Sequence, residues 1–435
     1  MGTEAADRVL RWIDETSADL VESVRELIRV PSVNPNYPGT RFDDHIGYES
    51  EANLVLRDSF AGIFDTTETL WSAPKRENFV GVVRGSGGGR SLLLNGHIDV
   101  VPTGGEDNWT FAPFGAQLDD GRIYGRGACD MKAGVVAGFW AAKALQECGI
   151  RLAGDLIVHS VAGEEVGERE IGTGLLLDRG YTADAAIVME PSASFGGPLS
   201  INPTAASLLW GKVRVEGKAG HPGMRRELVR AGGIGHRAGV NAIDKGYLVL
   251  QALYRLEEHW GISKQRPHYL PGHFTIMPGI INGGPNGIDA PLMFAEYCEI
   301  DFLVWYPQDE EPAAIQAEIT EFIARAVSID PWLSAHRPVF TWPLSYTGYH
   351  TAVDHPIVAA LGSAHLVASG GRSPVEAFPA ACDASCMSEL GIPVVNYGPG
   401  HLVNAHKADE SVEVAEIVTA ARSIALTAMD WCGLS

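Results

Sequence analysis

Short apolar runs that end at acidic residues or histidines recur along this chain. The run of leucines at residues 92–94 leads to His97, with Asp99 two positions later. Three later runs follow the same pattern: residues 155–162 lead to Glu164 and Glu165, residues 185–189 lead to Glu190, and residues 393–396 lead to His406. Short continuous apolar runs are typical of strands that are buried on both faces. The pattern therefore predicts four buried strands, each followed by a side chain that can bind a metal.

Helical patterns alternate with these strands and indicate an α/β fold. Residues 9–28 are amphipathic, and residues 131–148 form an apolar stretch rich in alanine and glycine. In open α/β sheets, binding sites lie beyond the carboxyl ends of the parallel strands. The four strand ends should therefore converge in one crevice. Asp130, directly before the second helix, is a fifth candidate, although taken alone it could be a helix N-cap.

The pattern changes after Glu190, which indicates a second domain. Residues 208–215 alternate as in a half-buried strand, residues 241–260 have a helical pattern, and two more strands are expected before residue 306. The next apolar run that leads to a candidate ligand, residues 393–396 before His406, lies near the end of the chain. We therefore expect this α+β module to be inserted into the α/β domain. We expect a catalytic domain with a mixed, mostly parallel sheet at residues 1–199 and 310–435, and the inserted domain at residues 200–309.

Composition and charge narrow the classes of function. The formal net charge of −21 over 435 residues argues against a nucleic-acid partner, because phosphate binding needs clustered basic residues. We expect no signal peptide and no membrane association, since no apolar stretch is long enough to span a bilayer. The six cysteines show no paired spacing, as expected for free thiols in a reducing compartment. These features predict a cytoplasmic enzyme that acts on a small molecule.

The candidate ligands match the needs of a hydrolase with two metal ions. Such a site requires a bridging carboxylate, a nitrogen ligand and a carboxylate for each ion, and a further carboxylate that accepts a proton from water. The assignment is His97 and Glu190 to one ion, Glu165 and His406 to the other, Asp130 as the bridge and Glu164 as the general base.

Several of these residues also have interpretations other than a metal site. Asp99 is too close to His97 in the chain to bind the same ion, so we expect its carboxylate to accept the second ring N–H of His97 and fix the tautomer. Taken alone, Glu164 and Glu165 could be solvated loop charges. Their joint position after predicted strands favours the metal site. The glycine cluster at residues 85–89 opens no helix, so it predicts a turn and no nucleotide-binding loop.

Five motifs carry a resemblance to a known family. They are residues 96–102 (GHIDVVP), 124–132 (YGRGACDMK), 163–165 (GEE), 189–191 (MEP) and 398–406 (GPGHLVNAH). Over residues 27 to 414 the chain resembles the M20 metallopeptidase family, which includes acetylornithine deacetylase, succinyl-diaminopimelate desuccinylase, aminoacylase and carboxypeptidase G2. The resemblance implies a zinc-exopeptidase-like catalytic domain with two divalent ions per chain, commonly zinc and sometimes cobalt or manganese. It also implies the ligand and base roles given above.

The resemblance has further implications for the inserted domain. It implies that residues 200–309 form a lid and dimerisation domain, so a homodimer is expected. His221 falls where relatives carry a lid histidine that crosses to the other subunit and stabilises the oxyanion, although without the family it would be a surface histidine in a turn. Asn286 resembles a substrate-binding lid asparagine. The resemblance also implies a cis peptide bond between Asp130 and Met131.

One departure from the family concerns the substrate. Lids of relatives usually carry an arginine that binds a substrate carboxylate, and residues 300–307 contain none. The leading hypothesis is a metal-dependent amidohydrolase for an N-acyl amino acid or a small dipeptide. Cleavage of another C–N bond, in a carbamoyl group or an aromatic amine, is the alternative that the missing arginine leaves open. A non-catalytic binder is disfavoured, because Glu164 and all five ligands are present, and a nicotinamide-dependent enzyme is disfavoured because the glycine fingerprint is missing.

Overall fold

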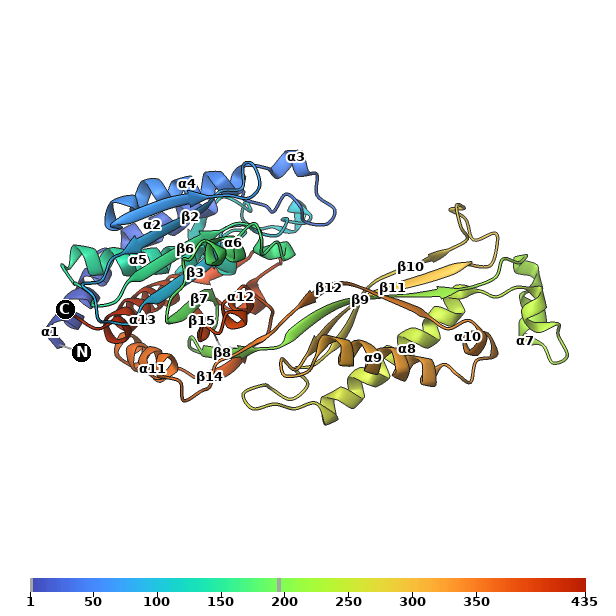
Figure 1. Ribbon diagram of the computed structural model, residues 1–435. Helices are drawn as coiled ribbons and strands as arrows, with labels where there is room; N and C mark the ends of the chain where they lie inside the picture. Colours follow the sequence, from blue (N-terminus) through green and yellow to red (C-terminus); the bar gives the residue numbers. More distant parts are fainter. Residues whose placement is uncertain (1–2, 194–196) are drawn as a thin grey trace. The chain divides into compact units, whose positions relative to one another are not determined.

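A mixed sheet of nine strands forms the centre of the first of two units (Figure 1). The computed structural model describes residues 3–193 and 197–435. Hydrogen bonds join the strands in the order β1, β2, β6, β3, β7, β15, β8 and β13, and β14 pairs with β8. Their bounds are β1 Thr66–Leu70, β2 Asn78–Val83, β3 Leu92–His97, β6 Leu156–Val161, β7 Ala185–Pro191, β8 Ile201–Ala205, β13 Tyr349–His350, β14 Val375–Phe378 and β15 Val394–Gly398.

The four central strands β6, β3, β7 and β15 are the strands that the apolar runs predict. They are parallel to one another, and every residue in them is buried. Burial on both faces explains why their apolar runs are continuous instead of alternating. The α/β class and the mixed sheet are therefore confirmed, and the carboxyl ends of the four strands lie at one edge of the sheet.

Helices cover the sheet of the first unit. Helix α5 contacts β3, β6, β7 and β15, and α13 packs on α5 and α11, whereas α12 contacts α6, β7 and β15. A small sheet of β4 (Gln117–Asp119), β5 (Arg122–Tyr124) and β16 (Ser411–Glu413) lies beside them. The helices are α1 Thr3–Glu15, α2 Ser17–Ile28, α3 Phe42–His45, α4 Tyr48–Phe60, α5 Ala133–Glu147, α6 Thr173–Asp178, α11 Pro356–Ser369, α12 Ala384–Glu389 and α13 Val414–Cys432.

Helix α5 approaches β7 very closely, at the point where β7 carries Glu190. A Cβ atom on Gly134 would lie 2.0 Å from the main-chain oxygen of Met189. No side chain fits there, so glycine is required for the helix to pack against the strand at this distance. The alanine and glycine content of the predicted helix thus has a packing reason, and the contact fixes the end of β7.

The second unit is a four-stranded antiparallel sheet packed against helices. Its strand order is β10, β11, β9 and β12, and the strands pair antiparallel. Buried residues of the sheet and of helices α8 and α9 form one apolar core. The bounds are β9 Ser207–Glu216, β10 Ile276–Gly284, β11 Tyr297–Tyr306, β12 Val339–Tyr346, α7 Arg225–Val229, α8 Ala242–Ser263, α9 Pro312–Ala326 and α10 Pro331–Ala335.

The observed limits of the second unit correct the expected domain boundary at residue 309. The unit comprises Ala205–Gly348 and Pro379–Ala381. Ile319 on α9 is fully buried in its core, and β12 pairs with β9. Residues 311–328 have a helical pattern in the sequence, but such a pattern does not indicate which sheet the helix covers. Residues 310–348 were therefore expected in the wrong domain, and so were the short segments 200–204 and 379–381.

Two further observations concern the chain as a whole. All six cysteines have free thiols. Among residues 3–193 and 197–435, no helix is both long and apolar enough to cross a membrane.

Candidate metal centre and active site

The candidate ligands of the first unit lie at the carboxyl ends of central strands or in the segments that follow these strands, except Asp130, which lies in the turn before α5. His97 is the last residue of β3, and Glu190 is the last but one of β7. Glu164 and Glu165 form a single helical turn, Glu164–Val166, after β6. Asp130 lies in the turn Ala128–Lys132, directly before α5. The order of strands in the sheet, not proximity in the chain, brings these side chains together.

His97, Asp130 and Glu190 form the first group of metal-ligand atoms. The Nε2 atom of His97 lies 3.2 Å from Oδ1 of Asp130 and 3.6 Å from Oε1 of Glu190. One ligand atom from each residue lies within 4.8 Å of the other two, and all three side chains are buried. These separations suit three ligands around one ion.

Asp130, Glu165 and His406 form the second group. The Nε2 atom of His406 lies 3.2 Å from Oε2 of Glu165 and 3.4 Å from Oδ2 of Asp130. The two carboxylate oxygens of Asp130 therefore face different histidines, one in each group. This is the arrangement expected of a bridging carboxylate between two ions. The peptide bond between Asp130 and Met131 is cis, in agreement with the sequence-based expectation.

Histidines are the ion-pair partners of the carboxylates at this centre. In the part of the chain that the structure describes, Asp130, Glu164, Glu165 and Glu190 form ion pairs with histidines and with no lysine or arginine. The Oε1 atom of Glu165 is buried and has no hydrogen-bond partner among the described residues. A buried oxygen without a donor is costly, and a bound cation would remove that cost. These residues therefore fit two divalent ions, and the mixture of imidazole and carboxylate ligands suits zinc, cobalt or manganese.

The pKa values of these groups reflect the same excess of negative charge. Burial raises the pKa of Glu190 to about 8 and the pKa of Glu164 well above the usual carboxylate range. Burial alone would lower the pKa of His406, but its hydrogen bonds with Asp130 and Glu165 raise this pKa to about 12. Without metal ions, protons on these side chains reduce the negative charge of the centre. Bound metal ions would neutralise the same charge.

Glu164 differs from the five ligands. Its Oε2 atom lies 3.8 Å from Nε2 of His97, and it belongs to neither group of ligand atoms. A carboxylate that is only 11% exposed, lies beside His97 of the first group and belongs to neither group can exchange a proton with water or substrate. This position agrees with the role of general base that the sequence suggests.

Asp99 makes different contacts from those expected. The ring Nδ1 of His97 donates to the main-chain oxygen of Asp99 at 2.9 Å, whereas the Asp99 carboxylate lies 3.7 Å away. The carboxylate instead accepts the main-chain N–H groups of Glu164 and Glu165, at 3.2 and 3.1 Å. This corrects the expected contact: the main chain turns after β3 so that the Asp99 carbonyl fixes the imidazole, which leaves the side chain to hold the turn after β6.

Two residues near Asp130 were not identified from the sequence. Glu410 accepts the main-chain N–H groups of Cys129 and Asp130, at 3.0 and 3.1 Å, and forms a buried ion pair with Arg126. Burial raises the pKa of Glu410 to about 7. Arg126 lies inside a recognised motif, but nothing in the sequence distinguishes Glu410 from other acidic residues. Its role depends on a contact between distant segments.

His221 and Asn286 both lie in the second unit and are exposed. The ring Nδ1 of His221 accepts the main-chain N–H of Gly223 at 3.1 Å. The main-chain N–H of Asn286 donates to Glu296 at 3.1 Å. The contacts within the second unit do not test the catalytic or substrate-binding roles expected of these residues, so both roles stay predictions.

The fold and the centre together define a class of protein. Two groups of imidazole and carboxylate ligands share one aspartate at the strand ends of an α/β domain, and a further glutamate lies beside them. This combination is typical of hydrolases that use two metal ions. The sequence model described as "Peptidase family M20/M25/M40" matches residues 93–430, and the chain belongs to this family.

Several characterised relatives and solved structures are similar over almost the whole chain. The chain is 31% identical to the N-formyl-4-amino-5-aminomethyl-2-methylpyrimidine deformylase of Halalkalibacterium halodurans, with 98% of both chains covered. It is 33% identical to the Bacillus subtilis deformylase of the same name, covering 82% of this chain and 84% of that one. The structure of human carnosine dipeptidase 1 has a TM-score of 0.74 at 15% identity, with 98% of both chains covered.

The bridging position of Asp130 leads to a prediction about metal content. Asp130→Ala should lower metal occupancy more than His97→Ala or Glu190→Ala, because Asp130 contacts both groups of ligands whereas the other two contact one. Elemental analysis of the folded, purified variants after equilibration with metal measures this. If Asp130→Ala still holds two ions per chain, Asp130 is not a bridging ligand.

Proposed function

We propose that this chain hydrolyses the formamide of a small N-formylated amine attached to a heteroaromatic ring. As a member of the M20 family it is a metal-dependent hydrolase that acts on C–N amide bonds. The observation that carries the choice of substrate is the similarity, along almost the full length, to two enzymes named as deformylases of an aminomethylpyrimidine.

The missing lid arginine supports this substrate. Strand β11 (Tyr297–Tyr306) contains no arginine, and Arg214 on the adjacent β9 is already paired with Glu216 and Glu299. An N-acyl amino acid presents a carboxylate that needs a cationic partner, whereas an N-formyl aminomethyl heteroaromatic presents none. A lid strand without arginine therefore favours the second kind of substrate over the first.

In the proposed reaction, different residues of the first unit have different roles in hydrolysis. Two bound divalent ions, zinc being the first choice and cobalt or manganese possible, would polarise the amide carbonyl and acidify a water molecule. Glu164 would accept the proton of the attacking water and deliver it to the leaving amine. Asp99 would keep Glu164 and Glu165 in place through their main-chain N–H groups, and its carbonyl would hold the His97 ring in the tautomer that leaves Nε2 unprotonated.

The second unit would complete the site as a dimer. Strand β10 is an edge strand of its sheet, and it exposes Met277, Ile280 and Ile281 with 47%, 53% and 54% of their surface accessible. An apolar edge strand of this kind is a template for pairing with a second chain. In such a homodimer His221 would reach the partner's site and stabilise the oxyanion. Asn286 would contact the substrate, and it is the next candidate for the oxyanion role.

The charge and the free cysteines support a place in the cytoplasm. The net charge of −21 disfavours a nucleic-acid partner, and six free thiols suit a reducing compartment. The partners proposed are therefore a small-molecule substrate, the metal ions and a second copy of the chain.

A panel of amides tests the proposed substrate. We expect the wild-type protein to hydrolyse an N-formyl aminomethylpyrimidine about 10-fold or more faster, by kcat/KM, than its N-acetyl counterpart, because one extra methyl group in a fitted pocket is worth about 10–200-fold. Turnover should stop with chelator and return with added metal. Glu164→Gln should bind metal normally but lose about 10²–10⁴-fold in turnover, since only the proton acceptor is removed. Release of amine is the measurement.

Two outcomes of this panel would count against the proposal. If N-acetylornithine or a dipeptide is the best substrate, the formamide assignment is wrong and the N-acyl amino acid hypothesis takes its place. If metal-loaded Glu164→Gln turns over like the wild type, Glu164 is not the general base.

Mixing two inactive variants tests the dimer and the role of His221. His221→Ala and Glu164→Gln should each be nearly inactive, but after subunit exchange the mixture should regain about a quarter of wild-type activity. In an equal mixture half the dimers are mixed, and one of their two sites has both an intact base and an intact partner histidine. A mixture that stays inactive although exchange is demonstrated, or a single His221→Ala variant with normal activity, would refute the crossing histidine.

A further inference from the structure

The turn that carries Glu164 and Glu165 is held at both of its ends. At its start, the Asp99 carboxylate accepts the N–H groups of both glutamates. At its end, the main-chain N–H of Glu168 donates to the carbonyl of Gly163 at 2.9 Å, and the N–H of Gly167 donates to the carbonyl of Glu164 at 2.8 Å. The segment 163–168 is therefore a closed loop whose shape depends on where Glu168 is fixed.

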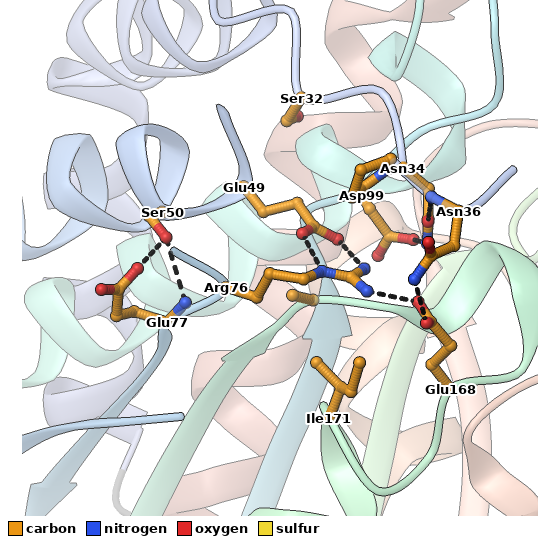
Figure 2. Close-up of polar contacts among 12 residues, drawn as sticks. Ser32, Asn34, Asn36, Glu49, Ser50, Arg76, Glu77, Asp99, Glu168 and Ile171 are labelled. Atoms are coloured by element: carbon orange, nitrogen blue, oxygen red, sulfur yellow. Dashed lines mark hydrogen bonds and ion pairs between the residues drawn. The ribbon is translucent and has the colours of Figure 1, made fainter. Parts of the chain in front are cut away.

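The side chain of Glu168 is bound by Arg76, which lies in a buried ion group (Figure 2). The Nη1 atom of Arg76 lies 2.6 Å from Oε2 of Glu168. The other two nitrogens of the guanidinium bind both oxygens of Glu49, Nε at 2.5 Å and Nη2 at 2.6 Å. The side chains of Arg76 and Glu49 are 1% and 0% exposed. Since Glu49 is on α4 and Arg76 lies two residues before β2, Glu168 is attached to α4 and to the segment that enters β2.

A second route joins the same two ends of the loop. Asn36 donates to Oε1 of Glu168 at 2.6 Å, its main-chain N–H donates to Oδ1 of Asn34 at 2.9 Å, and Nδ2 of Asn34 donates to Asp99 at 2.8 Å. Figure 2 shows Asn34 and Asn36 between Asp99 and Glu168. The hydrogen bonds thus form a ring that includes the loop, Asp99, the two asparagines and Glu168.

Stability alone is a weak explanation for this ion group. The cost of taking an arginine and two carboxylates out of water is large, and apolar replacements of buried ion pairs are often neutral or stabilising. A planar guanidinium with three bonded nitrogens does, however, fix directions as well as distances. Among the hydrogen bonds of the described residues, Arg76 is connected to the segment 163–168 only through Glu168.

We infer that Arg76 is a positioning residue. Together with Glu49 it holds Glu168, and through Glu168 it holds the turn that places Glu165 in the second group of metal ligands and Glu164 beside His97. The inference rests on the proposed function, because it assigns a purpose to the turn that carries the base and one ligand. Arg76 itself touches none of the ligand side chains in the described hydrogen bonds and ion pairs.

Four variants separate positioning from a general loss of stability. Arg76→Met removes the guanidinium, Arg76→Lys keeps its charge without the fork, and Glu168→Gln removes one charge with little change of shape. Lys264→Met is the matched control, since Lys264 in the second unit also lies between two carboxylates, 2.6 Å from Glu310 and 3.1 Å from Glu318, and is 10% exposed.

We expect hydrogen exchange at residues 163–172 to accelerate in Arg76→Met and Glu168→Gln and to stay unchanged in Lys264→Met. Metal titration of the stripped protein should show affinity for one of the two ions reduced by about 10–100-fold, and kcat should fall by about the same factor with little change in KM. Arg76→Lys should recover part of each loss. Should Arg76→Met fail to fold, Glu168→Gln carries the same test.

Unchanged exchange and unchanged metal affinity in folded Arg76→Met or Glu168→Gln would overturn the inference, even if the unfolding temperature drops. Equal changes in Lys264→Met would also overturn it, because a general effect of losing an ion pair would then be sufficient. Exchange and metal titration require no substrate, so a failure of the proposed deformylase activity, or of Glu164 as the base, would leave these two readouts intact and be recognised separately.

Discussion

Several carboxylates lie close together beyond the ends of the central strands, and their mutual repulsion explains many of the surrounding contacts. Asp130, Glu165 and Glu190 supply ligand atoms within 4.8 Å of the other members of their groups, and Glu164 lies beside them. At an effective dielectric constant of about 20, two like charges about 4 Å apart repel by about 4 kcal/mol. The described ion pairs supply only two imidazoles in return. A chain with these buried carboxylates needs stabilising contacts elsewhere in the fold, bound cations, or both.

The fold meets this constraint with main-chain contacts made by further buried acids. Asp99 holds the N–H groups of Glu164 and Glu165, and Glu410 holds those of Cys129 and Asp130. Glu410 has a buried arginine as its partner, which offsets the charge that it adds. The ligand-bearing turns are thus fixed through their backbones, which leaves the ligand side chains available for ions. The rigid parallel strands and the close contact of α5 with β7 at Gly134 provide the frame.

The sequence predicts those features that depend on local pattern. The apolar runs predict the central strands. The residues that follow those strands, together with Asp130 before α5, are the candidate ligands and candidate base, and the structure brings the five candidate ligands into two groups. The contact of Asp99 was predicted incorrectly, since the choice between its carbonyl and its carboxylate depends on how the chain turns after β3. Glu410, Arg76 and Glu168 are not recognisable from the sequence, because each acts through a partner that is distant in the chain. The end of the second unit was also predicted incorrectly, because a helical pattern does not indicate on which sheet the helix packs.

If two ions bind on either side of Asp130, anomalous diffraction will locate both of them. Crystals of the protein loaded with zinc, measured on both sides of the zinc absorption edge, should show two anomalous peaks about 3.5–4 Å apart. One peak should be bounded by His97 and Glu190 and the other by Glu165 and His406, with one oxygen of Asp130 directed at each. A single peak, or peaks that leave Asp130 without a metal contact, would contradict the account.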